Sequence, residues 1–321
     1  MHAVDARGAS VTILTMPEFR PPYTPLVSPG QIELFERDMT VTMAADLSLG
    51  AVQEKLGAVG QWLPVDGDAN AAIGELVAQN STGPLRLGYG AWRDLLLGCQ
   101  FRNGAGELIT AGGRTVKNVA GYDLTKFVVG QRGSIATIVA LTTRTYRRPA
   151  GAVLATFAPS ISLVQELIPS ALRPQWMLLT GDALLCGYLA DERSLGYYAS
   201  SLASAHPRSV ARRTIEEDVA HRGMLWSALS GAAMGFRAAL PPARIQEFVA
   251  RARLTEWIAD PAFGIVVGRA ADPRALQMTA EELGGNAFSL DADGIRAGGS
   301  TNVLQDQVVA RLRDAFNSMT A

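Results

Sequence analysis

The stretch from Gly112 to Gly133 constrains the fold of this chain more than any other, because five of its residues are glycines. Glycine adopts positive φ without a steric cost and lets the backbone approach a neighbour or a ligand closely. Glycine-rich loops with basic neighbours suit a pyrophosphate, because backbone N–H groups converge where no Cβ intrudes. The same spacing fits two surface turns around a strand equally well, so both interpretations stay open. The charged and hydrogen-bonding side chains of the stretch are Arg114, Lys117, Asn118, Tyr122, Asp123, Lys126 and Arg132.

The common nucleotide-binding fingerprints are missing from the sequence. The chain contains no GxxxxGKS/T motif, so a P-loop is unsupported. It also contains no GxGxxG motif between a strand and a helix, so a Rossmann dinucleotide site is unsupported. A nucleotide ligand therefore requires a different architecture.

The length and composition indicate a globular protein with a large core. The chain has 321 residues, enough for two domains, and 48% of them are hydrophobic while 18% are charged. The net charge of −1 creates no overall field that would favour nucleic acid or an anionic membrane. We therefore expect no nucleic-acid partner.

Cysteine and histidine usage argues against a disulfide framework and a metal site. The only cysteines, Cys99 and Cys186, stand in apolar surroundings in different predicted domains, as expected of buried free thiols in a reducing compartment. The histidines, at His2, His206 and His221, do not cluster, so we predict neither a histidine metal site nor a histidine-dependent triad.

The N-terminus lacks the basic start and apolar core of a signal peptide. No apolar run approaches the ~20 residues of a membrane span. Crowded prolines between Pro17 and Pro29 predict an extended surface segment. We expect a cytoplasmic protein that associates with a membrane only through a partner.

Strand and helix patterns alternate along the first half. Met39, Val41 and Met43 are separated by threonines, a period of two that predicts a strand. Gly74 lies inside a helix, which indicates close approach by a neighbouring element or a ligand. The other predicted elements are a helix capped by Ser48, a strand over 63–66, a helix over 71–80, turns at 80–83 and 88–90, a hairpin at Asn103-Gly104 and a strand over 134–149.

The second half consists of two related units. Each has the order strand, helix, strand pair, helix, over 152–205 and 232–285, which predicts an α+β fold. A charged and then helical segment over 211–231 separates the units, and a helix over 304–316 ends the chain. We place a first domain at 1–149 and a second, α+β domain with the C-terminal helix at 150–321.

No constellation in the sequence predicts a nucleophile or an acid–base pair. Asp66 and Asp68 are either paired carboxylates or a turn, and the glycine between them favours the turn. Asp123 either polarises a ligand or caps a helix. Lys117 is the best candidate for an anion partner, with a solvated lysine as the alternative. Arg237 lies mid-strand and is a candidate for a substrate contact, because an inward arginine usually has an anionic partner.

Three ordered motifs carry a resemblance to a known family: DMTVTMAADLSLGAVQEKL, LPVDGDANAAIGELVAQNSTGPLRLGYGAWRDLLLG and GGRTVKNVAGYDLTKFVVGQRG. Together they resemble the FAD-binding domain (PCMH type) of the vanillyl-alcohol oxidase superfamily, and within it the FAD-binding E subunits of bacterial glycolate oxidase. The resemblance covers 32–149 strongly and the rest in pattern only. It implies an α+β, two-domain flavoprotein with FAD between two subdomains and a cap domain over the flavin.

The resemblance also assigns residues to the cofactor. They are Pro64, Asp66, Ile73, Gly74, Asn80, Ser81, Gly83, Tyr89, Gly90, Asp94, Lys117, Asn118, Gly121, Tyr122, Asp123, Gly130, Gly133 and Ile138. The family begins with a glycine-rich loop around the pyrophosphate, of which Gly8-Ala9-Ser10 is the nearest remnant. We therefore expect FAD to bind weakly. We also expect it to bind non-covalently, because the cofactor loops contain no histidine or cysteine apart from Cys99, which lies on a strand.

The resemblance implies a subunit of a complex that oxidises glycolate or another small 2-hydroxyacid, with the flavin accepting a hydride from the α-carbon. Its partners would be a larger flavoprotein and an iron–sulfur protein. No catalytic base is identified. Two alternatives stay open: a non-catalytic, flavin-poor scaffold subunit, and a stand-alone flavoprotein with another substrate.

Overall fold

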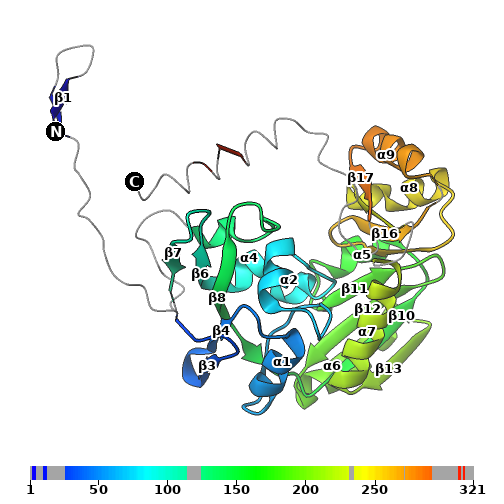
Figure 1. The fold of residues 1–321 in the computed structure, drawn as a ribbon. Coiled ribbons are helices and arrows are strands. Elements are labelled where there is room, and N and C mark those ends of the chain that lie inside the picture. The colour runs from blue at the N-terminus through cyan, green and yellow to red at the C-terminus, as the bar shows by residue number, and fades with distance from the viewer. Residues whose placement is uncertain are drawn as a thin grey trace.

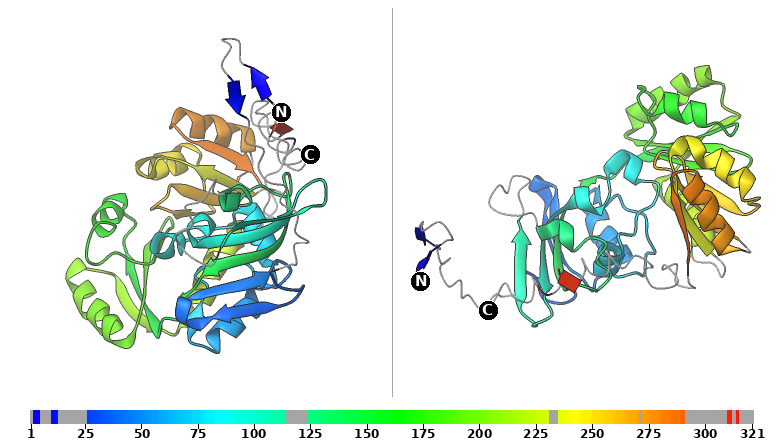
Figure 2. Two further views of the ribbon diagram at one scale, coloured as in Figure 1. Left: turned by 90° about the vertical axis from the view of Figure 1, so that its left-hand side faces the viewer. Right: turned by 90° about the horizontal axis from the view of Figure 1, so that it is seen from above.

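The computed structural model describes residues 2–4, 10–12, 26–113, 124–230, 235–270, 272–290, 310–311 and 314. Their strands form two large sheets, one of five strands and one of eight, and helices pack on both, so the predicted α+β class is confirmed. The two sheets lie side by side (Figures 1 and 2). The division into two domains at 149/150 stays a prediction.

The five-stranded sheet belongs to the first half of the chain and has the order β3-β4-β8-β6-β7. The predicted hairpin is confirmed, because β6 pairs antiparallel with β7 around 103–107. The helices of this half cover the sheet face that is turned toward the second half (Figure 1). The strands are β3 (Ile32–Phe35), β4 (Thr40–Ala44), β6 (Leu96–Arg102), β7 (Leu108–Gly112) and β8 (Thr137–Arg144), and the helices are α1 (Leu49–Gly57), α2 (Ile73–Gln79), α3 (Arg86–Tyr89) and α4 (Trp92–Leu95).

Smaller elements complete this half. A strand pair joins β5 (Gln61–Trp62) to β9 (Tyr146–Arg147), and another joins β1 (His2–Val4) to β2 (Ser10–Thr12). The 3-10 turns are η1 (Glu36–Asp38) and η2 (Leu124–Phe127).

Local sequence explains most of these elements. Ser48 caps α1 as predicted, since its hydroxyl accepts a hydrogen bond from the backbone of Ala51 at 3.2 Å. All residues of β4 are buried, and the strand lies inside its sheet between β3 and β8. The strand predicted over 63–66 is wrong: β5 ends at Trp62, and the side chain of Gln53 satisfies both backbone polar groups of Leu63 in place of a strand partner.

The eight-stranded sheet has the order β13-β10-β12-β11-β15-β16-β14-β17. The two predicted units lie next to each other in it and join where β11 pairs with β15. The strands are β10 (Gly151–Phe157), β11 (Trp176–Leu179), β12 (Leu184–Ala190), β13 (Ser209–Arg213), β14 (Gly235–Ala239), β15 (Trp257–Asp260), β16 (Ile265–Arg269) and β17 (Asn286–Ser289). The helices are α5 (Ile161–Leu167), α6 (Glu192–Ser201), α7 (Ile215–Ser230), α8 (Ile245–Arg251) and α9 (Pro273–Glu282), with 3-10 turns η3 (Leu202–Ala205) and η4 (Pro242–Arg244).

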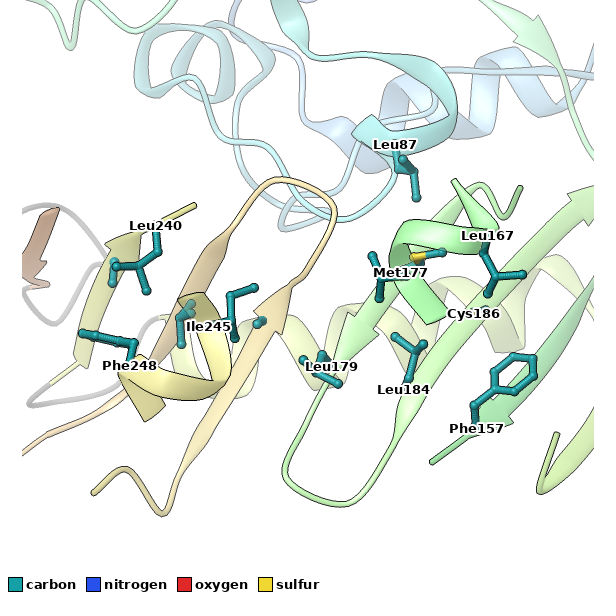
Figure 3. Close-up of a cluster of buried hydrophobic side chains, with 14 of the residues drawn as sticks. Leu87, Phe157, Leu167, Met177, Leu179, Leu184, Cys186, Leu240, Ile245 and Phe248 are labelled. Carbon is teal, nitrogen blue, oxygen red and sulfur yellow. The ribbon is translucent and has the colours of Figure 1, made fainter. Parts of the chain in front are cut away.

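Side chains of this sheet alternate between two cores. One face packs against α5, α6, α8 and α9, and the other packs against α7 and the first half. Figure 3 shows part of the first of these cores. On β11, for example, Met177 and Leu179 belong to the first core, whereas Trp176 and Leu178 belong to the second. Leu87 of α3 reaches into the first core above Met177, as Figure 3 shows, so a helix of the first half is anchored in the second half.

Gly74 lies at a tight contact between two segments of the first half. A Cβ on Gly74 would stand 2.7 Å from the Cβ and 3.0 Å from the carbonyl oxygen of Ala45. The Gly74 N–H also donates to that carbonyl at 2.9 Å. A neighbouring protein segment therefore explains this helical glycine without a ligand.

We predict that Gly74→Ala lowers the free energy of unfolding by about 1–3 kcal/mol, because overpacking outweighs the helix propensity that alanine gains. Gly196→Ala is the matched control, since Gly196 lies in α6 and a Cβ there meets nothing within 4 Å. That variant should gain roughly 0.5–1 kcal/mol. Denaturant unfolding measures both, and equal stability changes in the two variants would contradict the packing argument.

Candidate functional site

A small pocket gathers several of the predicted cofactor residues. Its volume is about 10 Å³, room for one water molecule. Three separate segments of the first half form it, at 64–66, 81–86 and 90–92. The residues from the prediction that line it are Pro64, Asp66, Ser81, Gly83 and Gly90, and the others include Thr82, Arg86 and Trp92.

Asp66 links this pocket to the second half of the chain. Its Oδ2 accepts from the backbone N–H of Leu85 at 2.8 Å, and its Oδ1 accepts from Nε of Arg222 at 2.7 Å. Arg222 also donates to Asp218, whose other oxygen accepts from the indole N–H of Trp176 at 3.1 Å. Both carboxylate oxygens of Asp66 are therefore bonded within the protein, so the residue holds the pocket loops in place.

Arg222 and Asp218 are a buried ion pair on α7. Arg222 is 2% exposed and Asp218 is 0% exposed, and their spacing of four residues places them on one side of the helix. Burial opposes the charge of Arg222, but the two carboxylates, of Asp66 and Asp218, more than offset this and raise the pKa of the guanidinium. Burial raises the pKa of Asp218, and the positive charge of Arg222 opposes that shift.

A second ion pair spans the two halves at Arg86. Its Nε donates to Oδ2 of Asp260 at 3.2 Å, and its guanidinium lies 3.8 Å from the ring centroid of Phe263. The pair makes one hydrogen bond rather than two, because Nη2 of Arg86 and Oδ1 of Asp260 are buried without a hydrogen-bond partner. Burial raises the pKa of Asp260 to about 6, against the lowering effect of Arg86.

Arg237, the predicted substrate contact, lies beside this pair. Arg237 on β14 pairs with Val267 on β16, and Asp260 lies two residues after Ile258 on β15. Val267 and Ile258 belong to the core between the sheet, α7 and the first half, so both charged side chains lie on that face of the sheet. Among the described residues, none forms a hydrogen bond with the Arg237 side chain. Burial, with the like charges of Arg86 and Arg132, lowers its pKa to about 10, although Asp260 opposes the shift.

The remaining described residues from the cofactor prediction do not line the pocket. Ile73 and Gly74 are buried in the core of the first half, and Ile138 packs against that core. Tyr89 makes edge-on ring contacts with Trp62 and Tyr146, and burial raises the pKa of its phenol.

The others lie at the end of α2, in α4 and in turns. Asn80 ends α2 with a φ of 51°, and the Asp94 carboxylate accepts from the backbone N–H of Ala91 at 2.8 Å. Gly130 and Gly133 take positive φ, as their place in the glycine-rich stretch predicts, and so does Gly112. A Cβ on Gly112 would meet Gly98 and Thr125, so this glycine serves packing rather than a ligand.

The predicted residues at the centre of the motif, Lys117, Asn118, Gly121, Tyr122 and Asp123, lie outside the described residues, as do Gly8 and Ala9. Their assignment to FAD stays a prediction. The turn predicted around Asp68 is present, because Asp68 accepts from the backbone N–H of Asn70 at 2.9 Å.

Sequence reasoning missed four residues of the site: Arg86, Asp218, Arg222 and Asp260. Two signals in the sequence could have indicated them. Asp218 and Arg222 are four residues apart on a helix, and Asp260 places a carboxylate at the end of an apolar strand. Their partners lie 156 and 174 residues away, beyond the reach of a local pattern.

The rim of the pocket carries groups that can donate hydrogen bonds to oxygen acceptors. Arg86 brings a buried guanidinium donor without a partner, and Ser81 and Thr82 bring short polar side chains. The pyrimidine edge of a flavin has this chemistry. Among the described residues, no group of His, Cys, Asp and Glu is arranged to hold a metal ion. Within the same residues, the helices are too short or too polar to cross a bilayer.

We predict that Arg222→Met destabilises the protein by about 3–5 kcal/mol, because it leaves the carboxylates of Asp66 and Asp218 without their counter-ion. Arg212→Met is the control, since Arg212 pairs with Glu192 at 2.7 Å but both side chains are more than half exposed. Its cost should be about 1 kcal/mol or less. A similar loss in both variants, measured by denaturant unfolding, would refute a special role of the buried pair.

Asp260 should make stability depend on pH. Its folded pKa of about 6 lies above the unfolded value of 3.8, so its contribution is complete below the unfolded value and is lost as pH rises through the folded one. The loss is on the order of 3 kcal/mol. Relative to Asp260→Asn, the natural protein should therefore become less stable between about pH 4 and pH 6.5.

A carboxylate with the opposite shift provides the control. Hydrogen bonding to the Ser194 backbone lowers the pKa of Asp191, so the stability that it contributes is lost as pH falls. Relative to Asp191→Asn, the natural protein should therefore lose stability only as pH falls below the unfolded value of 3.8, and the two should run parallel between pH 4 and pH 6.5. Parallel curves for the natural protein and Asp260→Asn would contradict the assignment.

Comparison with known proteins gives partial matches. No protein-family model matches the chain. Glycolate oxidase subunit GlcE of Escherichia coli (strain K12) is 31% identical over 123 residues, which are 37% of this chain and 35% of that protein. Mitochondrial D-lactate dehydrogenase (cytochrome) of Arabidopsis thaliana is 30% identical over 122 residues, 38% of this chain and 22% of that protein. An uncharacterized FAD-linked oxidoreductase of Mycobacterium tuberculosis is 32% identical over 113 residues, 34% of this chain and 25% of that protein.

The structural match is wider than the sequence match. Alkyldihydroxyacetonephosphate synthase superimposes with a TM-score of 0.63 at 11% identity, covering 94% of this chain and 66% of that one. At this identity the match shows the fold alone. The chain spans about a third or less of the length of the curated relatives described above. The predicted resemblance to oxidoreductases of the glycolate oxidase type is thereby confirmed over part of the chain, and the fold is shared over most of it.

Proposed function

We propose that this chain is an FAD-binding subunit of an oxidoreductase that acts on small 2-hydroxyacids. The observation that carries the proposal is the pocket, where five residues that the family resemblance assigns to the cofactor come together from separate segments beside the free donor of Arg86. The glycolate and D-lactate enzymes among the relatives support this substrate class.

Each half of the chain has a role in this proposal. In the first half, the pocket rim meets the flavin, and Lys117 with its neighbours in the glycine-rich stretch meets the phosphates. Bound FAD supplies the acceptor for the hydride that leaves the α-carbon of the substrate.

The second half provides the substrate contact. Arg237 lies on the face turned toward the first half and has no described hydrogen-bond partner, as a residue that binds the carboxylate of a hydroxyacid would. Asp66 and Arg222 hold the two sides of the site together. We therefore treat them as positioning residues.

A non-catalytic scaffold subunit is the second candidate. It is favoured by Asp66, whose two oxygens are bonded within the protein, and by the small volume of the pocket. In both cases we propose that the chain assembles with a larger flavoprotein subunit and an iron–sulfur subunit. The name of the E. coli relative, a glycolate oxidase subunit, supports an assembly of several chains. We also propose two domains, at 1–149 and 150–321, the second acting as a cap.

FAD affinity separates these candidates. A pyrophosphate that lacks even two charge-assisted hydrogen bonds, each worth roughly 1.5–3 kcal/mol, loses about two to four decades of affinity. We predict micromolar or weaker FAD binding by the chain alone and tighter binding once a partner closes the site. The flavin should be released completely by acid, because the attachment is non-covalent.

The test is a titration of purified chain with FAD, alone and with its partner, followed by visible absorbance. A variant in the pocket rim, Gly83→Val, should lower the affinity, whereas Gly181→Ala, where a Cβ meets nothing within 4 Å, should leave it unchanged. No flavin binding even in the complex would favour the scaffold, and nanomolar affinity for the chain alone would contradict the expected loss of the pyrophosphate loop.

A further inference from the structure

The strand β7 is an open edge of the five-stranded sheet. Among the described strands it pairs with β6 alone, and Figure 1 shows it on the side of the molecule away from the second half. Thr110 and Gly112 in this strand are exposed, and Leu108 and Ile109 are half-buried. An edge strand presents a row of unpaired backbone groups, so it can pair with a strand of another chain.

The pairing with β6 determines which backbone groups of β7 point outward. Two hydrogen bonds of 3.1 Å bracket the strand, from the Asn103 N–H to the Glu107 carbonyl and from the Gly113 N–H to the Leu97 carbonyl. Hydrogen-bonded and non-bonded pairs alternate along an antiparallel ladder. In this register the odd-numbered residues of β7 bond to β6, and the even-numbered residues turn their N–H and C=O groups away from the sheet.

These outward groups belong to Leu108, Thr110 and Gly112. They form no hydrogen bond with the described residues. A second β7 strand, placed antiparallel around a two-fold axis at Thr110, satisfies them. The N–H and C=O of Thr110 then exchange hydrogen bonds with Thr110 of the other copy, and the Gly112 N–H donates to the Leu108 carbonyl across the axis.

The side chains of β7 are complementary in the same register. Leu108 lies opposite Gly112 and Ile109 lies opposite Ala111, so each large side chain faces a small one. Thr110 faces its own copy, and threonine pairs across two strands are favourable. The strand contains no charged residue and no proline, the two devices that most often prevent edge pairing.

The other edge strands of the two large sheets have charges in or beside them. Glu33 lies in β3, and Arg212 and Arg213 lie in β13. β17 is uncharged over its four residues, but Asp291 and Asp293 follow it in the sequence. Charges on an edge strand favour contact with water over contact with a second strand. Of these edges, β7 is therefore the best suited to pair with a copy of itself.

We propose that β7 is the interface of a homodimer, in which two copies of this chain pair edge to edge and join their five-stranded sheets into one. A strand of five residues buries a small area, so we expect a weak dimer with a Kd roughly in the micromolar range. The proposal goes beyond the proposed function and does not depend on it, because no residue of the pocket takes part.

Sedimentation velocity of the purified full chain, at concentrations below and above roughly 10 μM, tests the dimer. Thr110→Glu should weaken it about fivefold or more, because the two carboxylates stand opposite each other at the two-fold axis. The new carboxylate can still accept from Nε2 of Gln100, as the Thr110 hydroxyl does at 2.9 Å. Ser209→Glu is the matched control, because Ser209 is exposed on the edge strand β13, and it should leave the dimer unchanged.

A charge exchange tests the register. Thr110→Lys should also weaken self-association, but an equimolar mixture of Thr110→Lys and Thr110→Glu should form a heterodimer at least as tight as the natural dimer, because opposite charges then face each other. No recovery in the mixture would contradict the two-fold axis at Thr110.

Hydrogen exchange of the natural chain gives a second measurement that needs no variant. The Thr110 amide should exchange more slowly at high protein concentration, whereas the Ser209 amide should not change. A chain that stays monomeric at all concentrations, or a dimer that Thr110→Glu and Ser209→Glu affect equally, would overturn the proposal. If the chain is monomeric and Thr110→Glu weakens its binding to the larger subunit, the edge serves that subunit and the homodimer is wrong.

Discussion

The structure depends on one buried charge, that of Arg222. A guanidinium that is 2% exposed is tolerated only with counter-charges in hydrogen-bond contact, and it has two, Asp66 and Asp218. Asp218 belongs to the same helix, but Asp66 belongs to the first half of the chain. Arg222 therefore has both counter-charges only when the two halves are in contact. Its bond to Asp66 also holds the pocket segment at 64–66 in place.

The eight-stranded sheet makes this junction possible because both of its faces are covered. The period of two along β14 and β15 sends Phe236 and Ala259 to the core under the outer helices. The same period sends Arg237 and Asp260 to the face that meets the first half, where Arg86 reaches Asp260. Charge thus gathers at the junction, between two apolar clusters, where it is screened little by solvent and acts strongly on any ligand.

Local patterns predicted much of the fold. Period-two alternation and turn glycines identified β4, the hairpin of β6 and β7, and both strand–helix–strand–strand–helix units, because each of these depends on residues close in sequence. The same patterns failed over 63–66, where the side chain of Gln53 replaces a strand partner. A side-chain bond of this kind leaves no periodic trace.

The candidate site was predicted in part. The motif resemblance located Pro64, Asp66, Ser81, Gly83 and Gly90, which the pocket brings together. It did not predict that Asp66 forms an ion pair with Arg222. The two residues are 156 positions apart, and the packing of α7 on the sheet brings them together. Gly74 shows the converse: its place in a family motif indicated the cofactor, while Ala45 accounts for it.

The central proposal is that a hydride passes from a hydroxyacid to FAD at the junction of the two halves. Anaerobic reduction of the bound flavin, followed by absorbance in the complex with its partner, measures this most directly. The account predicts that a 2-hydroxyacid bleaches the flavin bound by this chain and that Arg237→Gln abolishes the bleaching while FAD stays bound. A flavin that binds this chain but is reduced by no hydroxyacid, or is reduced equally well in Arg237→Gln, would contradict it.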